Sequence, residues 1–240
     1  DTPGYIEQPA YKMHKMMNAY ITMSFDDADV ILFVTDPFEP LSEQNSLLNR
    51  IASHAAPVLG IINKTDLTSP EILETRAAEL SVLLPGRKIH QISALKNEGV
   101  TNLMQEIKSL LPEGPPFYPK DQLTDRPERF FVSEIIREKI LELYHDEIPY
   151  TCEVSVETFS EGDSNSGPIT RISANIYTMD DRKKSILLGK GGIAIKQLGT
   201  DARNEIESFL GKRVFLELVV KVRENWRNDD NSLKSFGYQN

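Results

Sequence analysis

Cysteine is nearly absent from this 240-residue sequence, and no long uninterrupted apolar segment occurs in it. The one cysteine, Cys152, has no second thiol to pair with inside the chain, which excludes an internal disulfide and fits a reducing compartment. Apolar runs such as 30–34 and 214–220 are too short or too interrupted to span a bilayer. The four histidines have no metal-ligand spacing, which argues against a structural zinc site.

The composition is that of a globular protein, with 40% hydrophobic and 26% charged residues in a length that suits two compact domains. The net charge of −9 is unevenly distributed. Residues 121–163 contain 12 acidic and 4 basic residues, whereas residues 182–213 contain 8 basic and 3 acidic residues. A local basic region matters more for phosphate binding than the overall sum. The acidic total therefore does not exclude nucleic acid as a ligand.

The first half of the chain alternates strand and helix patterns. The segment 29–36 is a continuous apolar run that ends in a polar residue, as a buried parallel strand does. Strands of this kind are predicted at 29–36, 57–64 and 88–95, and helices at 42–54 (with Ser42 as N-cap), 69–84 and 99–111. Strands separated by helices of this length imply βαβ units and a parallel sheet.

The second half has a different order of elements. The proline-dense segment 113–127 is predicted as a linker between a domain at 1–112 and a domain at 128–240. The second domain is predicted to contain a helix at 130–144, strands at 151–159 and 169–179 around a polar loop at 160–168, helices at 182–188 and 193–210, a strand at 213–222, and a short helix within 228–237 capped by Asp229 or Asp230. The first of these helices is predicted to have Ile135, Ile136, Ile140 and Leu143 on one side. The order α-β-β-α-α-β is the type II KH arrangement.

Asn63-Lys64-Thr65-Asp66 lies where the second predicted strand ends, which is where open α/β sheets bind ligands. The Asp66 carboxylate offers two acceptor oxygens to the paired N–H donors on one edge of guanine, and adenine has no such pair. Asn63 can bridge the loop and the ring, and the Lys64 stem can lie over the purine face. Adenine would leave the carboxylate unpaired, so this motif favours guanine. Alone, it could also be a chance match.

Two further segments support the guanine interpretation. Ser93-Ala94-Leu95 ends the next predicted strand, and a small residue there lets a backbone N–H reach the guanine oxygen. Asp1-Thr2-Pro3-Gly4 lies 62 residues upstream of Asn63 and matches the DxxG motif of GTPases. In those proteins the aspartate holds Mg²⁺ through water and the glycine N–H contacts the γ-phosphate, roles that fall here on Asp1 and Gly4. Glycine suits this position because a side chain would block the close approach of backbone to phosphate.

The catalytic and phosphate-binding parts of such a site depart from the pattern. Tyr5 follows the DxxG motif where Ras-like proteins have the glutamine that orients the attacking water, which suggests slow hydrolysis or help from a partner. No Gly-x₄-Gly-Lys-Ser/Thr phosphate loop occurs in the sequence. Because the sequence begins inside a motif, we expect it to be a fragment that lacks its N-terminal phosphate loop and is inactive alone as a GTPase. The strand at 29–36 should then form an exposed apolar edge.

Gly189-Lys190-Gly191-Gly192 fits the GXXG loop with which KH domains clamp single-stranded RNA. The alternatives are a glycine-rich turn between packed helices and a basic run that is only a solvated helix face. The predicted RNA-binding residues are Lys183, Lys184, Gly189, Lys190, Gly191, Gly192, Lys196 and Arg203. The apolar residues that could accept bases, each of which could equally be core, are Ile186, Leu187, Ile193, Ile195 and Leu198.

Several longer segments resemble the Era family of ribosome-assembly GTPases. They are 130–139 (FFVSEIIREK), 148–150 (IPY), 188–196 (LGKGGIAIK), 215–222 (FLELVVKV), and Trp226 with 233–238 (LKSFGY). Together with DTPG, NKTD and SAL, the resemblance covers essentially the whole chain. It implies an α/β fold, part of a Ras-like P-loop GTPase domain with a parallel sheet and helices, followed by an α+β type II KH domain.

The resemblance also implies a function, a set of ligands and a location. It implies a GTP-hydrolysing switch that binds the 3′ region of small-subunit, 16S-type ribosomal RNA and assists assembly of the small ribosomal subunit. The implied cofactors are GTP or GDP and Mg²⁺, bound by Asp1 (also the metal ligand), Thr2, Pro3, Gly4, Tyr5, Asn63, Lys64, Thr65, Asp66, Ser93, Ala94 and Leu95. We expect a monomer in the bacterial cytoplasm or in a plastid or mitochondrial matrix. Peripheral membrane contact occurs in the family.

Two other interpretations remain at this point. The chain could be a non-hydrolysing KH adaptor for RNA with a degenerate nucleotide domain. It could also belong to another RNA-linked GTPase branch, against which the KH order and the tail argue.

Overall fold

The computed structural model describes residues 2–41, 46–115, 119, 126–164 and 167–238. Contacts divide the chain into two compact units. The first contains Asp1–Ala10 and His14–Pro116, and the second contains Tyr11–Met13 and Phe117–Gln239. The main division falls inside the segment 113–127, for which the sequence predicts a linker.

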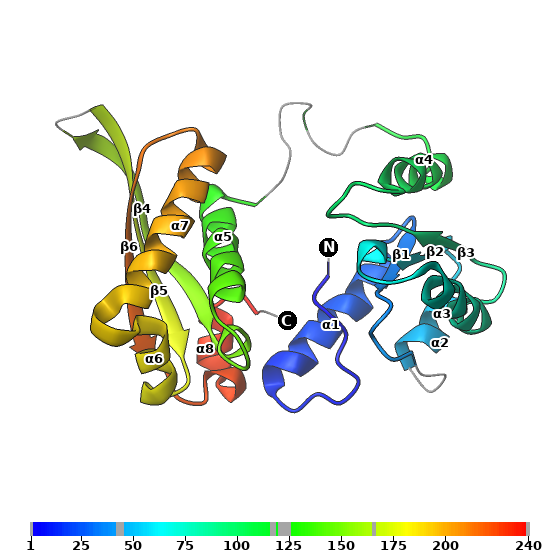
Figure 1. The fold of residues 1–240 in the computed structure, drawn as a ribbon, viewed down its shortest axis with the longest axis horizontal. Coiled ribbons are helices and arrows are strands. Elements are labelled where there is room, and N and C mark those ends of the chain that lie inside the picture. The colour runs from blue at the N-terminus through cyan, green and yellow to red at the C-terminus, as the bar shows by residue number, and fades with distance from the viewer. Residues whose placement is uncertain (1, 42–45, 116–118, 120–125, 165–166, 239–240) are drawn as a thin grey trace. The chain divides into compact units, whose positions relative to one another are not determined.

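The first unit is built on a parallel sheet of three described strands (Figure 1). Its strands are β1 (Ile31–Thr35), β2 (Val58–Ile62) and β3 (Lys88–Gln91), with β2 in the centre. Every residue of β2 is buried, because alternate side chains enter two different apolar clusters. The continuous apolar run that predicted a buried strand thus reflects burial on both faces.

Helices cover both faces of this sheet. α1 (Lys12–Asp26), α2 (Ser46–Ala52) and α3 (Pro70–Leu83) contribute to the cluster that contains Val58 and Ile62, and α4 (Val100–Leu110) contributes to the cluster that contains Leu59 and Ile61. α1 is missing from the elements predicted above. It has no acidic residue in its first turn and no basic residue in its last, so the usual helix signals are weak, and buried Ile21 and Phe25 anchor it by packing.

The second unit has the predicted order α-β-β-α-α-β. Its elements are α5 (Glu128–Leu143), β4 (Glu153–Ser164), β5 (Gly167–Thr178), α6 (Asp181–Leu188), α7 (Ile193–Leu210), β6 (Val214–Val222) and the tail helix α8 (Asp230–Ser235). β5 is central, antiparallel to β4 and parallel to β6. Asp229 caps α8 by accepting the Ser232 N–H at 2.7 Å. None of the described helices is long and apolar enough to cross a membrane.

Most predicted boundaries shift by one to four residues, and two loops and one helix face differ in kind. Ser42, the predicted N-cap, lies outside the described residues. The predicted loop 160–168 is mostly strand, since β4 and β5 stay paired from Ser160 opposite Arg171 to Ser164 opposite Gly167. The exposed polar residues there are held by backbone hydrogen bonds rather than burial, so no apolar alternation marks them. β3 ends at Gln91 and not at 95, because Ser93 and Glu98 exchange two backbone hydrogen bonds of 3.0 Å that close a turn.

The buried side of α5 is narrower than the sequence predicts. Val132, Ile136 and Ile140 repeat every four residues and are at most 1% exposed. Leu143, predicted on the same side, is 37% exposed. The next position of the stripe is Tyr144, whose hydroxyl donates to the Leu187 carbonyl oxygen at 2.8 Å and ties the end of α5 to α6.

Candidate nucleotide and nucleic-acid sites

The NKTD loop begins as a continuation of the sheet. The Asn63 N–H donates to the Thr35 carbonyl oxygen at 2.8 Å, so the loop leaves β2 in register with β1. Lys64 then adopts a left-handed conformation with φ 59°, and Thr65–Leu67 forms one short 3₁₀ turn. The Thr65 N–H donates to the Ile92 carbonyl oxygen at 3.2 Å. The NKTD loop is therefore fastened to the segment after β3, at the carboxyl edge of the sheet.

Asn63 joins the two loops through its side chain. Its Oδ1 accepts the Lys64 N–H at 2.8 Å and the Ala94 N–H at 3.0 Å. The Ala94 N–H is thus engaged by Asn63 and does not face a ligand. The next N–H, that of Leu95, has no hydrogen-bond partner among the residues that the structure describes, and the Leu95 side chain is 89% exposed. Leu95 therefore supplies the backbone donor that a purine oxygen could use.

Asp66 is held by Ser93. Its Oδ1 accepts the Ser93 hydroxyl at 2.7 Å, and its Oδ2 lies 3.9 Å from the Lys96 ammonium. The pKa of Asp66 is lowered, first because the Ser93 hydroxyl bonds the charged form, and also by the charge of Lys96. The carboxylate side chain is only 6% exposed. A charged, oriented pair of acceptor oxygens therefore stands at the predicted base-reading position.

Asp36 is a member of this site that no sequence motif identified. Its Oδ1 accepts the N–H groups of Phe38 at 2.8 Å and Glu39 at 2.9 Å, and its Oδ2 accepts the Lys64 ammonium at 2.7 Å. This bond is the first cause of a lowered pKa at Asp36 and of a raised pKa at Lys64. Asp36 follows β1 where Lys64 follows β2, and the ends of neighbouring parallel strands lie together. This adjacency of strand ends is the signal in the sequence that could identify Asp36. Lys96, which follows the SAL segment, is also absent from the predicted site residues.

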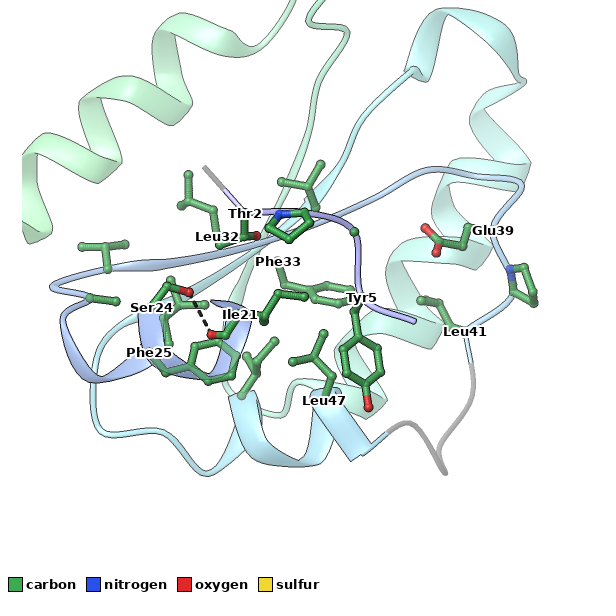
Figure 2. A pocket seen from close by; sticks show the side chains of 18 residues that line it. Thr2, Tyr5, Ile21, Ser24, Phe25, Leu32, Phe33, Glu39, Leu41 and Leu47 are labelled. Carbon is green, nitrogen blue, oxygen red and sulfur yellow. Dashed lines mark hydrogen bonds between the residues drawn. The ribbon is translucent and has the colours of Figure 1, made fainter. Parts of the chain in front are cut away.

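The residues of the DxxG motif lie along a different hollow. Asp1, the predicted metal ligand, lies outside the described residues. Thr2, Pro3, Gly4 and Tyr5 line a hollow of about 650 Å³ beside β1. Figure 2 shows the Tyr5 ring beside Leu47, and its hydroxyl lies 2.6 Å from the Ser46 hydroxyl. Among the described lining residues there is none from the NKTD or SAL segments, so the structure does not bring the two halves of the predicted nucleotide site into one cavity.

The same hollow exposes the edge of the sheet. β1 is the outer strand of the described sheet, and its side chains Leu32 and Val34 are 40% and 54% exposed. This matches the exposed apolar edge predicted from the sequence.

The seven remaining predicted nucleotide residues meet at the carboxyl ends of β2 and β3. They are Asn63, Lys64, Thr65, Asp66, Ser93, Ala94 and Leu95. In chemical terms this group presents carboxylate acceptors, an amide, one open N–H and a lysine stem. That set fits a guanine base, since the carboxylate matches its paired donors and the N–H matches its oxygen.

The GXXG loop turns the chain between α6 and α7. Gly189 has φ 70°, and a Cβ there would lie 2.6 Å from the Ala194 Cβ, so this glycine is required by packing. Gly191 has φ 63°, but a Cβ there would meet nothing within 4 Å. The space above Gly191 is therefore open, as it is above the turn glycine Gly211, and it leaves room for a ligand.

Among the basic residues predicted to bind RNA, one is paired with a carboxylate and others are exposed to solvent. The Lys183 ammonium lies 2.6 Å from Asp180, whose carboxylate also caps α6 by accepting the Lys183 N–H at 2.8 Å. Lys190, Lys196 and Arg203 are exposed, whereas Lys184 is half-buried. Lys196 and Arg203 lie seven residues apart on α7 and so share one face. The open positive charge is thus centred on the loop and on α7 rather than on Lys183.

The apolar residues predicted to accept bases also fall into two groups, buried and exposed. Leu187 and Leu198 are fully buried core residues, and Ile195 packs against the same core. Ile186 and Ile193 are 42% and 72% exposed on either side of the loop. These two side chains remain available to a base.

Comparisons with known proteins give matches in both halves of the chain. Residues 147–227 match the sequence model of the KH domain, and residues 1–109 match that of the family described as ethanolamine utilisation – propanediol utilisation. GTPase Era of Geotalea daltonii is 42% identical over 240 residues, covering 100% of this chain and 80% of the relative. GTPase Era of Carboxydothermus hydrogenoformans is 39% identical over 239 residues, covering 99% and 79%.

Two solved structures of Era resemble the whole chain. Each has a TM-score of 0.88 and 32% sequence identity, and the match covers 100% of this chain and 81% of the solved one. One is a substituted form of Era from Aquifex aeolicus bound to GDP and AlF₄⁻. The other is Era in complex with MgGDPNP and nucleotides 1506–1542 of 16S ribosomal RNA.

Proposed function

Because this chain belongs to the GTPase Era family, we propose that it acts as a GTP-binding and GTP-hydrolysing switch that binds the 3′ region of small-subunit ribosomal RNA and assists assembly of the small subunit. The proposal places it as a monomer in the bacterial cytoplasm. Peripheral membrane contact stays a prediction from the family resemblance.

The bond between Ser93 and Asp66 carries the nucleotide part of the proposal. It fixes one carboxylate oxygen and lowers the carboxyl pKa, so both oxygens are acceptors at neutral pH. The open Leu95 N–H lies two residues along from Ser93 and offers a donor to the guanine oxygen. Asp36 holds the Lys64 ammonium at 2.7 Å, which steadies the lysine stem for stacking on the purine. The carboxylate and the Leu95 N–H thus have partners on guanine that adenine would not supply, whereas the lysine stem can stack on either purine.

The phosphate part of the proposal falls on the DxxG residues. Asp1 is proposed to hold Mg²⁺ through water, and the Gly4 N–H to contact the γ-phosphate. Mg²⁺ held there would neutralise negative charge that develops on the phosphates during transfer. A Cβ at Gly4 would meet nothing within 4 Å, which leaves space for a phosphate beside the backbone. The Tyr5 hydroxyl is engaged by Ser46, so Tyr5 does not orient water and slow hydrolysis is expected.

The RNA part of the proposal rests on the GXXG loop. Lys190 is exposed at its tip, the space above Gly191 is open, and Ile193 stands exposed next to it. Phosphate can approach the backbone while a base rests on the isoleucine. The Era structure that contains 16S ribosomal RNA resembles this chain over its whole length and supports RNA from that region as the ligand.

Depletion of the protein in its own host tests the cellular role. We expect free small subunits to accumulate, with ribosomal RNA whose 3′ ends are unprocessed, when subunits are separated on sucrose gradients. Re-expression of the wild-type protein should restore both, whereas a Lys190→Asp variant should not. An unchanged subunit profile after depletion would contradict a role in assembly.

A further inference from the structure

A groove lies between α5 and α7 on the second unit, away from the GXXG loop. It consists of two adjoining hollows of about 660 and 370 Å³ that share Ile135 and Phe209. We call it the acidic groove. It runs beside the C-terminal half of α7, from Asp201 to Phe209, whereas the GXXG loop precedes the first residue of that helix.

The floor of the acidic groove is aromatic and partly exposed. The rings of Phe131 and Phe209 lie 5.3 Å apart between centroids, and Phe130 packs edge-on against Phe131 at 5.4 Å. Phe209 is 50% exposed and Leu141 is 54% exposed. Apolar surface of this kind, rimmed by charged residues, is typical of interaction sites. It also offers a place for one bulky apolar side chain.

The walls of the acidic groove carry excess negative charge. Its acidic lining residues are Glu134, Glu138, Glu142, Asp201 and Glu205, and its basic ones are Arg137 and Lys139, which gives a net charge of −3. Arg137 is already paired with Glu134 at 3.1 Å.

A single buried ammonium serves three of these carboxylates. Lys139 lies 2.6 Å from Glu205, 2.9 Å from Glu142 and 4.0 Å from Glu138. Its own side chain is 11% exposed, whereas those of Glu205, Glu142 and Glu138 are 43%, 53% and 56% exposed. One positive charge cannot neutralise three negative ones, so the outer carboxylates remain available to cations from outside.

We propose that the acidic groove binds a lysine- or arginine-rich protein segment that places one bulky apolar side chain against the exposed surface of Phe209 and Leu141. The negative charge excludes RNA as the occupant, because carboxylates repel phosphates. It is opposite in sign to the exposed cations at the GXXG loop, so one molecule can hold RNA at the loop and a cationic protein segment at the groove. Such segments accompany folded RNA, where they neutralise phosphate. The inference does not depend on the nucleotide site.

A short lysine-rich peptide with one central leucine, labelled with a fluorophore, tests the proposal by anisotropy. A matched peptide with serine in place of the leucine separates charge from apolar contact. The double variant Glu138→Gln/Glu142→Gln should weaken binding of both peptides about fivefold, since rim charges contribute modestly. The control Glu147→Gln/Glu157→Gln removes two exposed carboxylates elsewhere and should leave both affinities unchanged. Equal effects of the two double variants would overturn the proposal.

The apolar contact is tested separately. Phe209→Ala should lower the affinity for the leucine peptide to that for the serine peptide, and leave the serine peptide unaffected, with circular dichroism confirming the fold. No difference between the peptides in the wild-type protein would overturn the proposal. Weaker binding of ribosomal RNA in the Phe209→Ala variant, or self-association that Phe209→Ala abolishes in sedimentation, would assign the groove to another occupant and also overturn it.

Discussion

The Ser93 hydroxyl donates to Oδ1 of Asp66 at 2.7 Å, joining two loops whose residues stand 27 positions apart in the sequence. Ser93 is fully buried and has a second bond, since its hydroxyl oxygen accepts the Lys96 N–H at 3.2 Å. One hydroxyl thus orders the carboxylate that would read the base and the loop that would cover it.

Ser93→Ala should weaken GDP binding about tenfold, because the Asp66 carboxylate loses the bond that orients it. The pKa of Asp66 should rise toward its ordinary value, so affinity should be lost at a higher pH on acidification than in the wild-type protein. A pH series of nucleotide titrations measures both effects. Ser93→Thr keeps a hydroxyl and is the matched control. Equal GDP affinity in the Ala variant would remove Ser93 from the site.

Gly191→Asp should weaken binding of the 3′ region of 16S ribosomal RNA by more than about tenfold, because a carboxylate enters the space above the GXXG loop. Gly211→Asp is a closely matched control. Gly191 and Gly211 have the same backbone angles, φ 63° and ψ 21°, and a Cβ at either meets nothing within 4 Å. The two variants therefore share backbone strain and charge change, and differ only in place. Similar RNA affinities of both, measured by anisotropy, would contradict the RNA site.

The buried carboxyl group of Glu153 should make the stability of the folded protein depend on pH. Burial raises the pKa of Glu153, partly offset by the charge of Arg137 and by the Tyr238 hydroxyl, which donates to Oε2 at 3.0 Å. An acid with a raised folded pKa destabilises the fold while it is ionised, and this penalty disappears as pH falls through the folded pKa toward the unfolded one. Glu153→Gln should therefore stabilise the protein at neutral pH and make no difference below about pH 4.3. Urea unfolding at several pH values measures this, and a gain that grows on acidification would contradict it.

Tyr144→Phe should destabilise the protein by about 1 kcal/mol, because the buried Leu187 carbonyl loses its hydroxyl donor. Burial raises the pKa of Tyr144 to about 12. The unfolded phenol ionises near pH 10, so the loss should be constant at neutral pH and shrink only in more alkaline solution. Tyr150→Phe alters a side chain that is 72% exposed and should have no effect. Equal unfolding midpoints for the two variants would show that the Leu187 bond contributes nothing.

The meeting of Asn63, Asp66 and Ser93 could be predicted because motifs at the carboxyl ends of neighbouring parallel strands must converge. Asp36 converges there by the same rule, but a lone aspartate after a strand is no motif, and its role is visible only through the Lys64 contact. The sequence likewise suggested a guanine contact from the SAL backbone. Only the structure shows that Asn63 accepts the Ala94 N–H and that the Leu95 N–H has no hydrogen-bond partner among the described residues.

The differences between the predicted and the observed fold have a common cause. α1 and the far end of the β4–β5 hairpin lack the patterns by which helices and strands are identified. Ile21 and Phe25 hold α1 through contacts with distant residues, and ladder hydrogen bonds hold the hairpin where Glu161 and Asp163 are exposed. Leu143 was misplaced because Tyr144 fills the buried position and uses a hydroxyl to do so. Tertiary contacts determine the structure of α1, of the hairpin end and around Leu143, and such contacts cannot be inferred from local sequence patterns.

Asp66→Asn decides whether this carboxylate reads guanine. An amide presents one donor and one acceptor, so it suits xanthine, which has a carbonyl where guanine has an amino group. Comparing GDP with xanthosine diphosphate by amide NMR titration, with the Leu95 N–H as reporter, we expect the variant to lose affinity for GDP by about a hundredfold or more and to prefer the xanthine nucleotide. Retained preference for GDP would contradict the assignment of Asp66.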